Sequence, residues 1–267
     1  MDIIINALPL IIAGGIAGFL AGLLGIGGGI VTIPALFIVF TKLEVPFEWR
    51  MHAAIGTSLA IIVATNCSSA WAHNKKEAVD WNVVKTWWFT IVIGAVSGSY
   101  FATYLKTTEL VYFFATLAAF LAIKMLLPID KWKLGSSLPS GVFRFSNPTL
   151  IGFFSSVMGI GGGSFSVPYM TLYNIPIRRA VGTASVIGLV LSFAGTIGYI
   201  ISGQGIEGMP DGMLGFIHGP SAIIVSLAAV ITAPFGAKAA HWLPHKVLSI
   251  LFGLFLIGAT LRLINAV

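Results

Sequence analysis

The chain has 267 residues, of which 57% are hydrophobic and only 9% are charged, and its mean hydropathy is +0.96. Soluble domains carry about 25% charged residues, so this chain could not cover a water-facing surface and we predict an integral membrane protein. The net charge of +6 does not indicate a nucleic-acid partner, because the basic residues fall in short loops between apolar stretches. The single cysteine, Cys67, excludes an intramolecular disulfide and is expected to be a small buried side chain.

Ten apolar stretches follow one another along the chain. Three of them, 30–41, 148–158 and 164–173, are too short to cross a bilayer core of about 30 Å, which needs about 20 helical residues. The N-terminus has neither a basic region nor a small-residue cleavage site, so we expect no removable signal peptide. The stretches lie at roughly 3–24, 30–41, 53–72, 84–105, 109–127, 148–158, 164–173, 180–202, 212–237 and 246–265.

A duplication is visible around a glycine-rich motif. Gly25-Ile26-Gly27-Gly28-Gly29 returns 134 positions later as Gly159-Ile160-Gly161-Gly162-Gly163, and the segments 18–36 and 152–170 match without a gap at eight of nineteen positions. An Ala-x-Gly-Thr motif follows each copy, at 54–57 and 180–183. Both copies interrupt an apolar helix at the same place, and paired breaks of this kind indicate the binding site of a transporter.

The distribution of Lys and Arg tests whether each glycine motif forms a re-entrant hairpin. If both hairpins enter and leave on one face, the loops carry 11 basic residues on one side and 4 on the other. If the second hairpin crosses once, the split is 8 against 7. The stronger bias favours the re-entrant arrangement, with the basic side in the cytoplasm. A non-helical turn at membrane depth is tolerated only where protein or a cavity surrounds it.

Each half then makes an odd number of crossings, which inverts the second half relative to the first. We therefore predict an all-α polytopic membrane protein of two inverted-topology repeats, each a re-entrant or broken helical hairpin followed by three transmembrane helices. The N-terminal repeat covers 1–127, a cytoplasmic linker covers 128–147 and the C-terminal repeat covers 148–267. Both termini are predicted outside, in a multi-pass protein of a bacterial-type inner (plasma) membrane.

The two glycine turns are the candidate substrate site. Glycine lets the backbone take positive φ and approach a ligand without a Cβ in the way. The arms that follow the turns present N–H groups without intrahelical partners, and a helix N-terminus carries about half a positive charge, which favours an anion. The alternative is that the glycines only let helices pack closely. The substrate-binding residues predicted here are Gly27, Gly28, Gly29, Ile30, Gly161, Gly162, Gly163 and Ser164.

Hydroxyl groups at the second motif extend this candidate site. Thr57, Ser58 and Thr183 could donate hydrogen bonds to a substrate oxygen without placing a charge in lipid. Alternatively, the threonines bond within their own helix or to a neighbouring helix, as Ser and Thr often do in membranes. Asn66 lies deeper in the same stretch, where its polar counterpart is Ser192, and we give it less weight.

Acidic residues are absent from the interiors of the apolar stretches. All nine Asp and Glu residues fall in loops or at the ends of stretches, whereas proton- or sodium-coupled carriers commonly use an acid within the membrane. An inside-negative potential drives an anion outward by about 2.3 kcal/mol per charge per 100 mV, so export fits better than uphill uptake. No metal, cofactor or catalytic residue is predicted, because the chain lacks metal-spaced His/Cys clusters and motifs such as His-Glu-x-x-His. His218, beside Gly219-Pro220, is interpreted as the cap of a helix end.

The two Gly-x-Gly-Gly-Gly-x4-Pro blocks, Gly25–Pro34 and Gly159–Pro168, are each followed by Ala-x-Gly-Thr and resemble the sulfite exporter TauE/SafE family of membrane permeases. The resemblance covers the whole chain, including its length and its duplication. It implies transport of a small sulfur-containing oxyanion such as sulfite, thiosulfate or an organosulfonate like sulfoacetate. The second half departs from the first at Ala184, where the first half has Ser58, and at Ser156, where the first half has glycine.

These observations favour a permease that exports a small sulfur anion by alternating access around the two glycine turns. A channel-like anion pathway is the alternative within transport, and a membrane-embedded enzyme is the alternative outside it. The expected partners are the anion and the lipid bilayer, without nucleic acid. The sequence leaves open which anion is moved, in which direction, with which coupled ion, and whether the chain forms a homo-oligomer.

Overall fold

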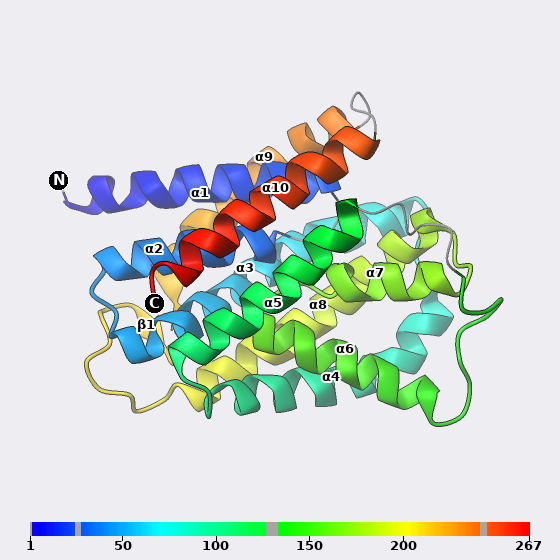
Figure 1. The fold of residues 1–267 in the computed structure, drawn as a ribbon, viewed down its shortest axis with the longest axis horizontal. Helices are drawn as coiled ribbons and strands as arrows, with labels where there is room; N and C mark the ends of the chain where they lie inside the picture. The colour runs from blue at the N-terminus through cyan, green and yellow to red at the C-terminus, as the bar shows by residue number, and fades with distance from the viewer. Residues whose placement is uncertain (1, 25–27, 127–132, 241–244) are drawn as a thin grey trace.

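The structure is a computed structural model that describes residues 2–24, 28–126, 133–240 and 245–267. Within these ranges the chain forms ten helices and one short antiparallel β-hairpin (Figure 1). The elements are α1 (Asp2–Leu24), α2 (Gly29–Lys42), α3 (Phe47–Lys75), α4 (Trp81–Ala102), α5 (Thr107–Leu126), α6 (Phe143–Met158), α7 (Gly163–Leu172), α8 (Ile177–Ser202), β1 (Met213–Leu214), β2 (Ile217–His218), α9 (Gly219–Ala240) and α10 (His245–Ile264).

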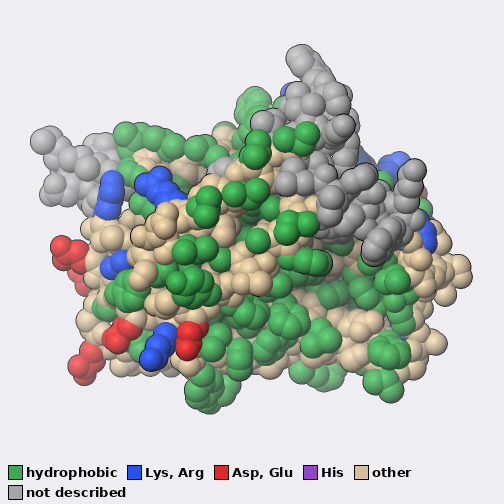
Figure 2. Space-filling view, in the orientation of Figure 1, with side chains coloured by type: hydrophobic (Ala, Val, Ile, Leu, Met, Phe, Trp, Pro, Cys, Tyr) green, Lys and Arg blue, Asp and Glu red, His purple; other side chains and the backbone are tan. Residues whose placement is uncertain are grey.

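The outer surface carries many apolar side chains, as contact with lipid requires. Figure 2 shows hydrophobic side chains spread over the face in view, while charged side chains gather toward the two ends of the molecule. Among the described residues, three helices are long and apolar enough to cross a bilayer, and they span Phe47–Lys75, Ile177–Ser202 and Gly219–Gly236. This architecture is that of a helical membrane protein, as the composition predicts.

The helices that flank the glycine motifs are interrupted where the sequence predicts. α1 ends at Leu24 and α2 begins at Gly29, while α6 ends at Met158 and α7 begins at Gly163. α2, α6 and α7 have 14, 16 and 10 residues, which is too short for a bilayer core of about 30 Å. In Figure 1 the outer ends of α1 and α2 lie at the end of the molecule that holds both termini, and those of α6 and α7 lie at the opposite end.

The predicted apolar stretch 212–237 is not a single helix. Its beginning forms the hairpin of β1 and β2, and α9 starts only at Gly219. Gly212 and Gly215 take φ values of 86° and 56°, a region that side chains with a Cβ rarely adopt. Turn geometry at these glycines therefore keeps the first residues of the stretch out of the helix, although the stretch is apolar in composition.

The core is centred on α3 and α8, which pack against each other. The first arm of each hairpin packs against a helix from the other half of the chain, α1 against α9 and α6 against α4. A Cβ on Gly18 would collide with the backbone of Ala229 in α9, and a Cβ on Gly152 would collide with the backbone of Ile91 in α4. Small residues permit such close approach between membrane helices. Gly18 and Gly152 are 134 positions apart, as the glycine motifs are.

Cys67 is exposed, so the expectation that it is buried is wrong. It lies on α3 beside Ser68, which is also exposed, and one turn before the exposed Trp71. Lipid tails are as apolar as a protein interior, so the composition of an apolar helix does not distinguish its lipid-facing side from its buried side.

Candidate substrate site

The second glycine turn joins α6 to α7 within the protein. α6 ends at Met158 and is capped by Gly159, whose φ of 65° lies in the left-handed region that favours glycine. The N–H of Ile160 donates to the carbonyl oxygen of Ser155 at 3.0 Å, which closes the end of α6. α7 then begins at Gly163, with Gly162 as its N-cap. The turn is buried, so the N–H groups at the start of α7 lie inside the protein.

The structure describes only the last two residues of the first glycine turn. Gly28 is the N-cap of α2, and its carbonyl oxygen accepts hydrogen bonds from the N–H groups of Val31 and Thr32, both at 3.0 Å. Gly29 is the first residue of the helix. Gly27, which the sequence also assigns to the site, lies outside the described residues.

The other residues predicted around the turns form the first turns of α2 and α7. The side chain of Ile30 is 1% exposed and belongs to the hydrophobic core, so its backbone N–H is the group it can offer to an anion. Ser164 is 3% exposed, and its N–H donates to the carbonyl oxygen of Gly161 at 3.3 Å. Gly163 begins α7.

The two glycine turns touch each other. A Cβ on Gly29 would lie 2.6 Å from the carbonyl oxygen of Gly159 and 3.0 Å from the Cα of Ile160. Any side chain at position 29 would therefore push the turns apart, and two backbones come this close only where glycine leaves out the Cβ. Motifs that lie 134 positions apart in the sequence thus meet at one place in the protein.

Ser58 and Thr32 link the two turns by hydrogen bonds. Ser58 Oγ donates to the carbonyl oxygen of Gly159 at 3.0 Å and lies 2.8 Å from Thr32 Oγ1. Thr32 Oγ1 in turn lies 3.1 Å from the carbonyl oxygen of Gly29. Two hydroxyl hydrogens serve these three contacts, so one contact lacks a hydrogen at any moment. Ser58 therefore lies at the turns, where the sequence places it, and its contact with a substrate stays a prediction.

The second half of the chain lacks this pair of hydroxyls. Ser166 corresponds to Thr32 and Ala184 corresponds to Ser58, so Ser166 has no counterpart of the hydroxyl that Thr32 contacts. Ser166 Oγ is buried without a hydrogen-bond partner among the described residues, and so is the Oγ of Ser156. Unpaired buried hydroxyls are uncommon, and both of these lie within about one helical turn of the second glycine turn. The surroundings of the two turns are therefore not equivalent.

Thr57 and Thr183 each accept a hydrogen bond from the other half of the chain. The N–H of His218, immediately before α9, donates to Thr57 Oγ1 at 3.0 Å. The N–H of Asp80, immediately before α4, donates to Thr183 Oγ1 at 2.8 Å. Each threonine thus fixes the start of a helix that belongs to the other half. This is the structural role that the sequence indicates as the alternative to substrate binding, namely a bond to a neighbouring helix. Donation of their hydroxyl hydrogens to a substrate stays a prediction.

Asn66 occupies a position whose importance the sequence did not indicate. It is 8% exposed, and its carboxamide forms no hydrogen bond with any residue that the structure describes. A Cβ on Gly188 of α8 would lie 2.6 Å from Asn66 Nδ2 and 3.3 Å from the backbone nitrogen of Gly162. The sequence contained a signal, a carboxamide within an apolar stretch, but only the fold shows that it lies beside the start of α7.

The polar groups around the turns are uncharged. No Lys, Arg, Asp or Glu is buried among the described residues, and no group of three His, Cys, Asp or Glu side chains in these ranges could hold a metal ion. His218 caps a helix end, as the sequence indicates, because its Nδ1 accepts a hydrogen bond from the N–H of Ser221 at 3.3 Å and lies 2.6 Å from Ser221 Oγ. Backbone amides, hydroxyls and one carboxamide are therefore the groups that a ligand would meet at the turns.

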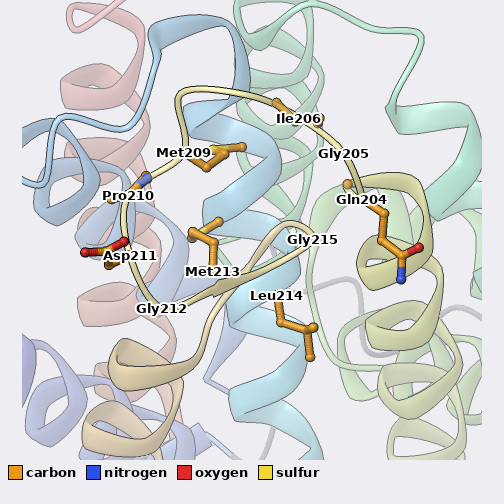
Figure 3. Close-up of a pocket in the computed structure, with 11 residues that line it drawn as sticks. Gln204, Gly205, Ile206, Met209, Pro210, Asp211, Gly212, Met213, Leu214 and Gly215 are labelled. Atoms are coloured by element: carbon orange, nitrogen blue, oxygen red, sulfur yellow. The ribbon is translucent and has the colours of Figure 1, made fainter.

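A separate pocket of about 340 Å³ lies in the segment between α8 and α9 (Figure 3). All of its lining residues come from Gly203 to Gly215, and Asp211 alone among them is charged. None of these residues belongs to the glycine turns or to the helices that begin there. The pocket is therefore distinct from the site that the duplicated motifs indicate.

Interrupted helices whose breaks meet inside a helical membrane protein are typical of membrane transporters. Residues 10–263 match the family described as sulfite exporter TauE/SafE, and the chain belongs to this family.

Three relatives agree with this class. The chain is 35% identical over 253 residues to a probable membrane transporter protein of Haemophilus influenzae, with 95% of this chain and 96% of the relative covered. It is 29% identical over 214 residues to the probable membrane transporter protein YunE of Bacillus subtilis, covering 73% of this chain and 78% of the relative. It is 28% identical over 237 residues to a probable membrane transporter protein of Methanocaldococcus jannaschii, covering 86% and 84%. These names indicate transporters rather than enzymes. No solved structure matches the chain significantly.

Proposed function

We propose that the protein exports a small sulfur-containing anion, such as sulfite, thiosulfate or an organosulfonate like sulfoacetate, by alternating access around the two glycine turns. The observation that carries this proposal is the contact between Gly29 and Gly159, which brings the start of α2 against the end of α6, at the turn that leads into α7, inside the protein. Helix N-termini favour negative charge. The family description, sulfite exporter, supports a sulfur oxyanion as the class of substrate.

Reciprocal packing supports two inverted repeats, 1–127 and 148–267, joined by a linker at 128–147. The first arm of each hairpin packs against the fourth helix of the other half, α1 against α9 and α6 against α4. The hydrogen bonds of Thr57 and Thr183 are exchanged in the same way. A pseudo-twofold axis in the membrane plane would produce this exchange of equivalent contacts.

The charges at the two ends of the molecule support a cytoplasmic linker and external termini in a bacterial-type inner membrane. An excess of Lys and Arg in short loops marks the cytoplasmic side. The end that holds both termini has the C-terminal ends of α2 and α10 and the N-terminal ends of α3 and α5 (Figure 1), and the described basic residues within or directly before these helix ends are Lys42, Arg50, Lys106 and Arg262. The opposite end has the C-terminal ends of α3 and α9 and the N-terminal ends of α4, α6 and α8 (Figure 1), and the described basic residues of these helix ends and the adjoining loops are Lys75, Lys76, Lys85, Lys133, Arg144, Arg178, Arg179 and Lys238.

A carrier fits the contact between the turns better than a channel does. In the described conformation the backbones of Gly29 and Gly159 touch, and Ser58 bonds across them. An anion that crosses between the turns therefore has to separate them, which couples its passage to a conformational change. A channel would need a path that stays open.

Transport by purified protein in proteoliposomes tests this function. We expect saturable flux of sulfite or sulfoacetate, and unlabelled anion on the opposite side should accelerate the exchange of labelled anion, as it does for a carrier. Gly29→Ala should lower this flux by at least about tenfold, because its Cβ would separate the turns. Gly258→Ala is the matched control, because a Cβ at that position meets nothing within 4 Å. Unchanged flux in Gly29→Ala, or flux that does not saturate, would contradict the proposal.

A further inference from the structure

Two hydrogen-bond donors come together at the start of α7. The Asn66 side chain is more than nine-tenths buried, and no described residue forms a hydrogen bond with its carboxamide. Asn66 Nδ2 and the backbone nitrogen of Gly162 both border the space that a side chain on Gly188 would fill, at 2.6 Å and 3.3 Å from a Cβ placed there. Gly162 is the N-cap of a ten-residue helix. A carboxamide with no hydrogen-bond partner in the described part of the chain therefore lies beside a helix N-terminus, and the glycine on α8 makes this approach sterically allowed.

The equivalent place beside the first glycine turn is apolar. Residues of α3 and α8 correspond at a separation of 126 positions, as the two Ala-x-Gly-Thr motifs do. Gly188 therefore corresponds to Ile62, whose Cδ1 would lie 2.8 Å from a Cβ on Gly29. Asn66 corresponds to Ser192, whose hydroxyl already donates to a carbonyl oxygen of its own helix at 3.2 Å. These two positions therefore offer an anion no side-chain donor comparable to the Asn66 carboxamide, and in this respect the polar site is one-sided.

The donors at this one-sided site are neutral. No Lys or Arg is buried among the described residues, and the helix N-terminus supplies only about half a positive charge. The cost of taking an ion out of water rises with the square of its charge, so a second negative charge would be poorly compensated. We propose that Asn66 and the start of α7 bind a singly charged sulfur oxyanion group, either hydrogensulfite or the sulfonate group of an organosulfonate, in preference to a group that itself carries two charges, such as sulfate. This inference rests on the proposed transport function.

The charge preference is tested on the purified full-length chain with methanesulfonate as the monoanion and sulfate as the dianion. In thermal-shift titrations we expect methanesulfonate to stabilise the protein at concentrations at least about tenfold lower than sulfate does. Flux of sulfite into proteoliposomes gives a second measurement, corrected for empty liposomes. At a fixed total sulfite concentration, the flux should rise as the pH falls and follow the fraction present as hydrogensulfite. Equal stabilisation by the two probes would overturn the charge preference.

Variants on the two sides of the turns test the location of the site. Asn66→Leu removes the carboxamide with little change in volume, and Gly188→Ala keeps the carboxamide but displaces it, because the added Cβ would lie 2.6 Å from Asn66 Nδ2. Both should weaken methanesulfonate binding by at least about tenfold, which is the loss expected for one hydrogen bond to a charged group. Ser192→Ala, at the position equivalent to Asn66, is the matched control and should change binding by less than about twofold.

The outcomes separate this inference from the proposed function. A wild-type protein that neither binds nor moves any sulfur anion would refute the transport function itself. Wild-type binding that survives in Asn66→Leu and Gly188→Ala, or that falls equally in Ser192→Ala, would refute only the one-sided site. If Asn66→Leu does not fold, Gly188→Ala and the smaller polar change Asn66→Ser decide the question by the same comparison.

Discussion

The hydrogen bond that Thr57 accepts from the N–H of His218 fixes the start of α9 to the first half of the chain. Thr57→Val keeps the shape of the side chain and removes the acceptor at 3.0 Å. Thr57 is 0% exposed, so the N–H would be left unpaired in a buried place, at a cost of about 1–3 kcal/mol. Thr183→Val removes the acceptor of the Asp80 N–H at 2.8 Å and should cost a similar amount.

The two substitutions act at different helix starts and share no partner. Their costs should therefore add in the double variant, to about 2–6 kcal/mol. The measurement is denaturant or thermal unfolding of the purified protein in detergent, with Thr57→Ser as the control, because serine keeps the acceptor oxygen. For single variants that fold, the KM for substrate flux should stay near the wild-type value. A Thr57→Val protein as stable as wild type but with a KM raised about tenfold would show that the hydroxyl serves the substrate and not α9.

Further predictions concern the link between the turns, the helix interface and pH. Ser58→Ala leaves a carbonyl oxygen of the second turn without its donor, so the unfolding free energy should fall by about 1–3 kcal/mol, and wild-type stability would contradict the link. Gly18→Ala should lower the melting temperature because its Cβ would collide with α9, whereas Gly15→Ala has ordinary van der Waals space; equal melting temperatures would refute this packing. Burial lowers the pKa of His218 from its ordinary value of 6.5, so the folded state binds fewer protons than the unfolded state. Its contribution to stability is full above pH 6.5 and is lost as the pH falls below that value. Below pH 6.5 the melting temperature of His218→Asn should therefore fall less steeply with decreasing pH than that of the wild type. An equally steep fall in the variant would show that His218 does not cause the pH dependence.

The class of the protein and the positions of its helix breaks can be predicted from the sequence because they depend on local properties. Hydropathy over about 20 residues decides whether a segment can enter a bilayer. The glycine run at 159–163 ends one helix and starts the next, because glycine alone takes a φ of 65° without steric cost. The same local rule explains why the predicted stretch 212–237 begins with a β-hairpin and not with a helix. The prediction of one continuous apolar stretch rested on composition and did not include the turns that Gly212 and Gly215 form.

The partners of the polar side chains were decided only by the tertiary structure. Thr57 bonds to a residue 161 positions away, and Ser58 bonds to one 101 positions away. The approach of Asn66 to Gly162 beside Gly188 could not be predicted either, because it depends on how α3, α7 and α8 pack against one another. The sequence alone thus determines that the chain is a duplicated membrane protein with paired glycine breaks. The contacts, and the difference between the two breaks, follow from which helix surfaces pack together, and apolar composition does not encode that choice, because lipid and protein interior are equally apolar.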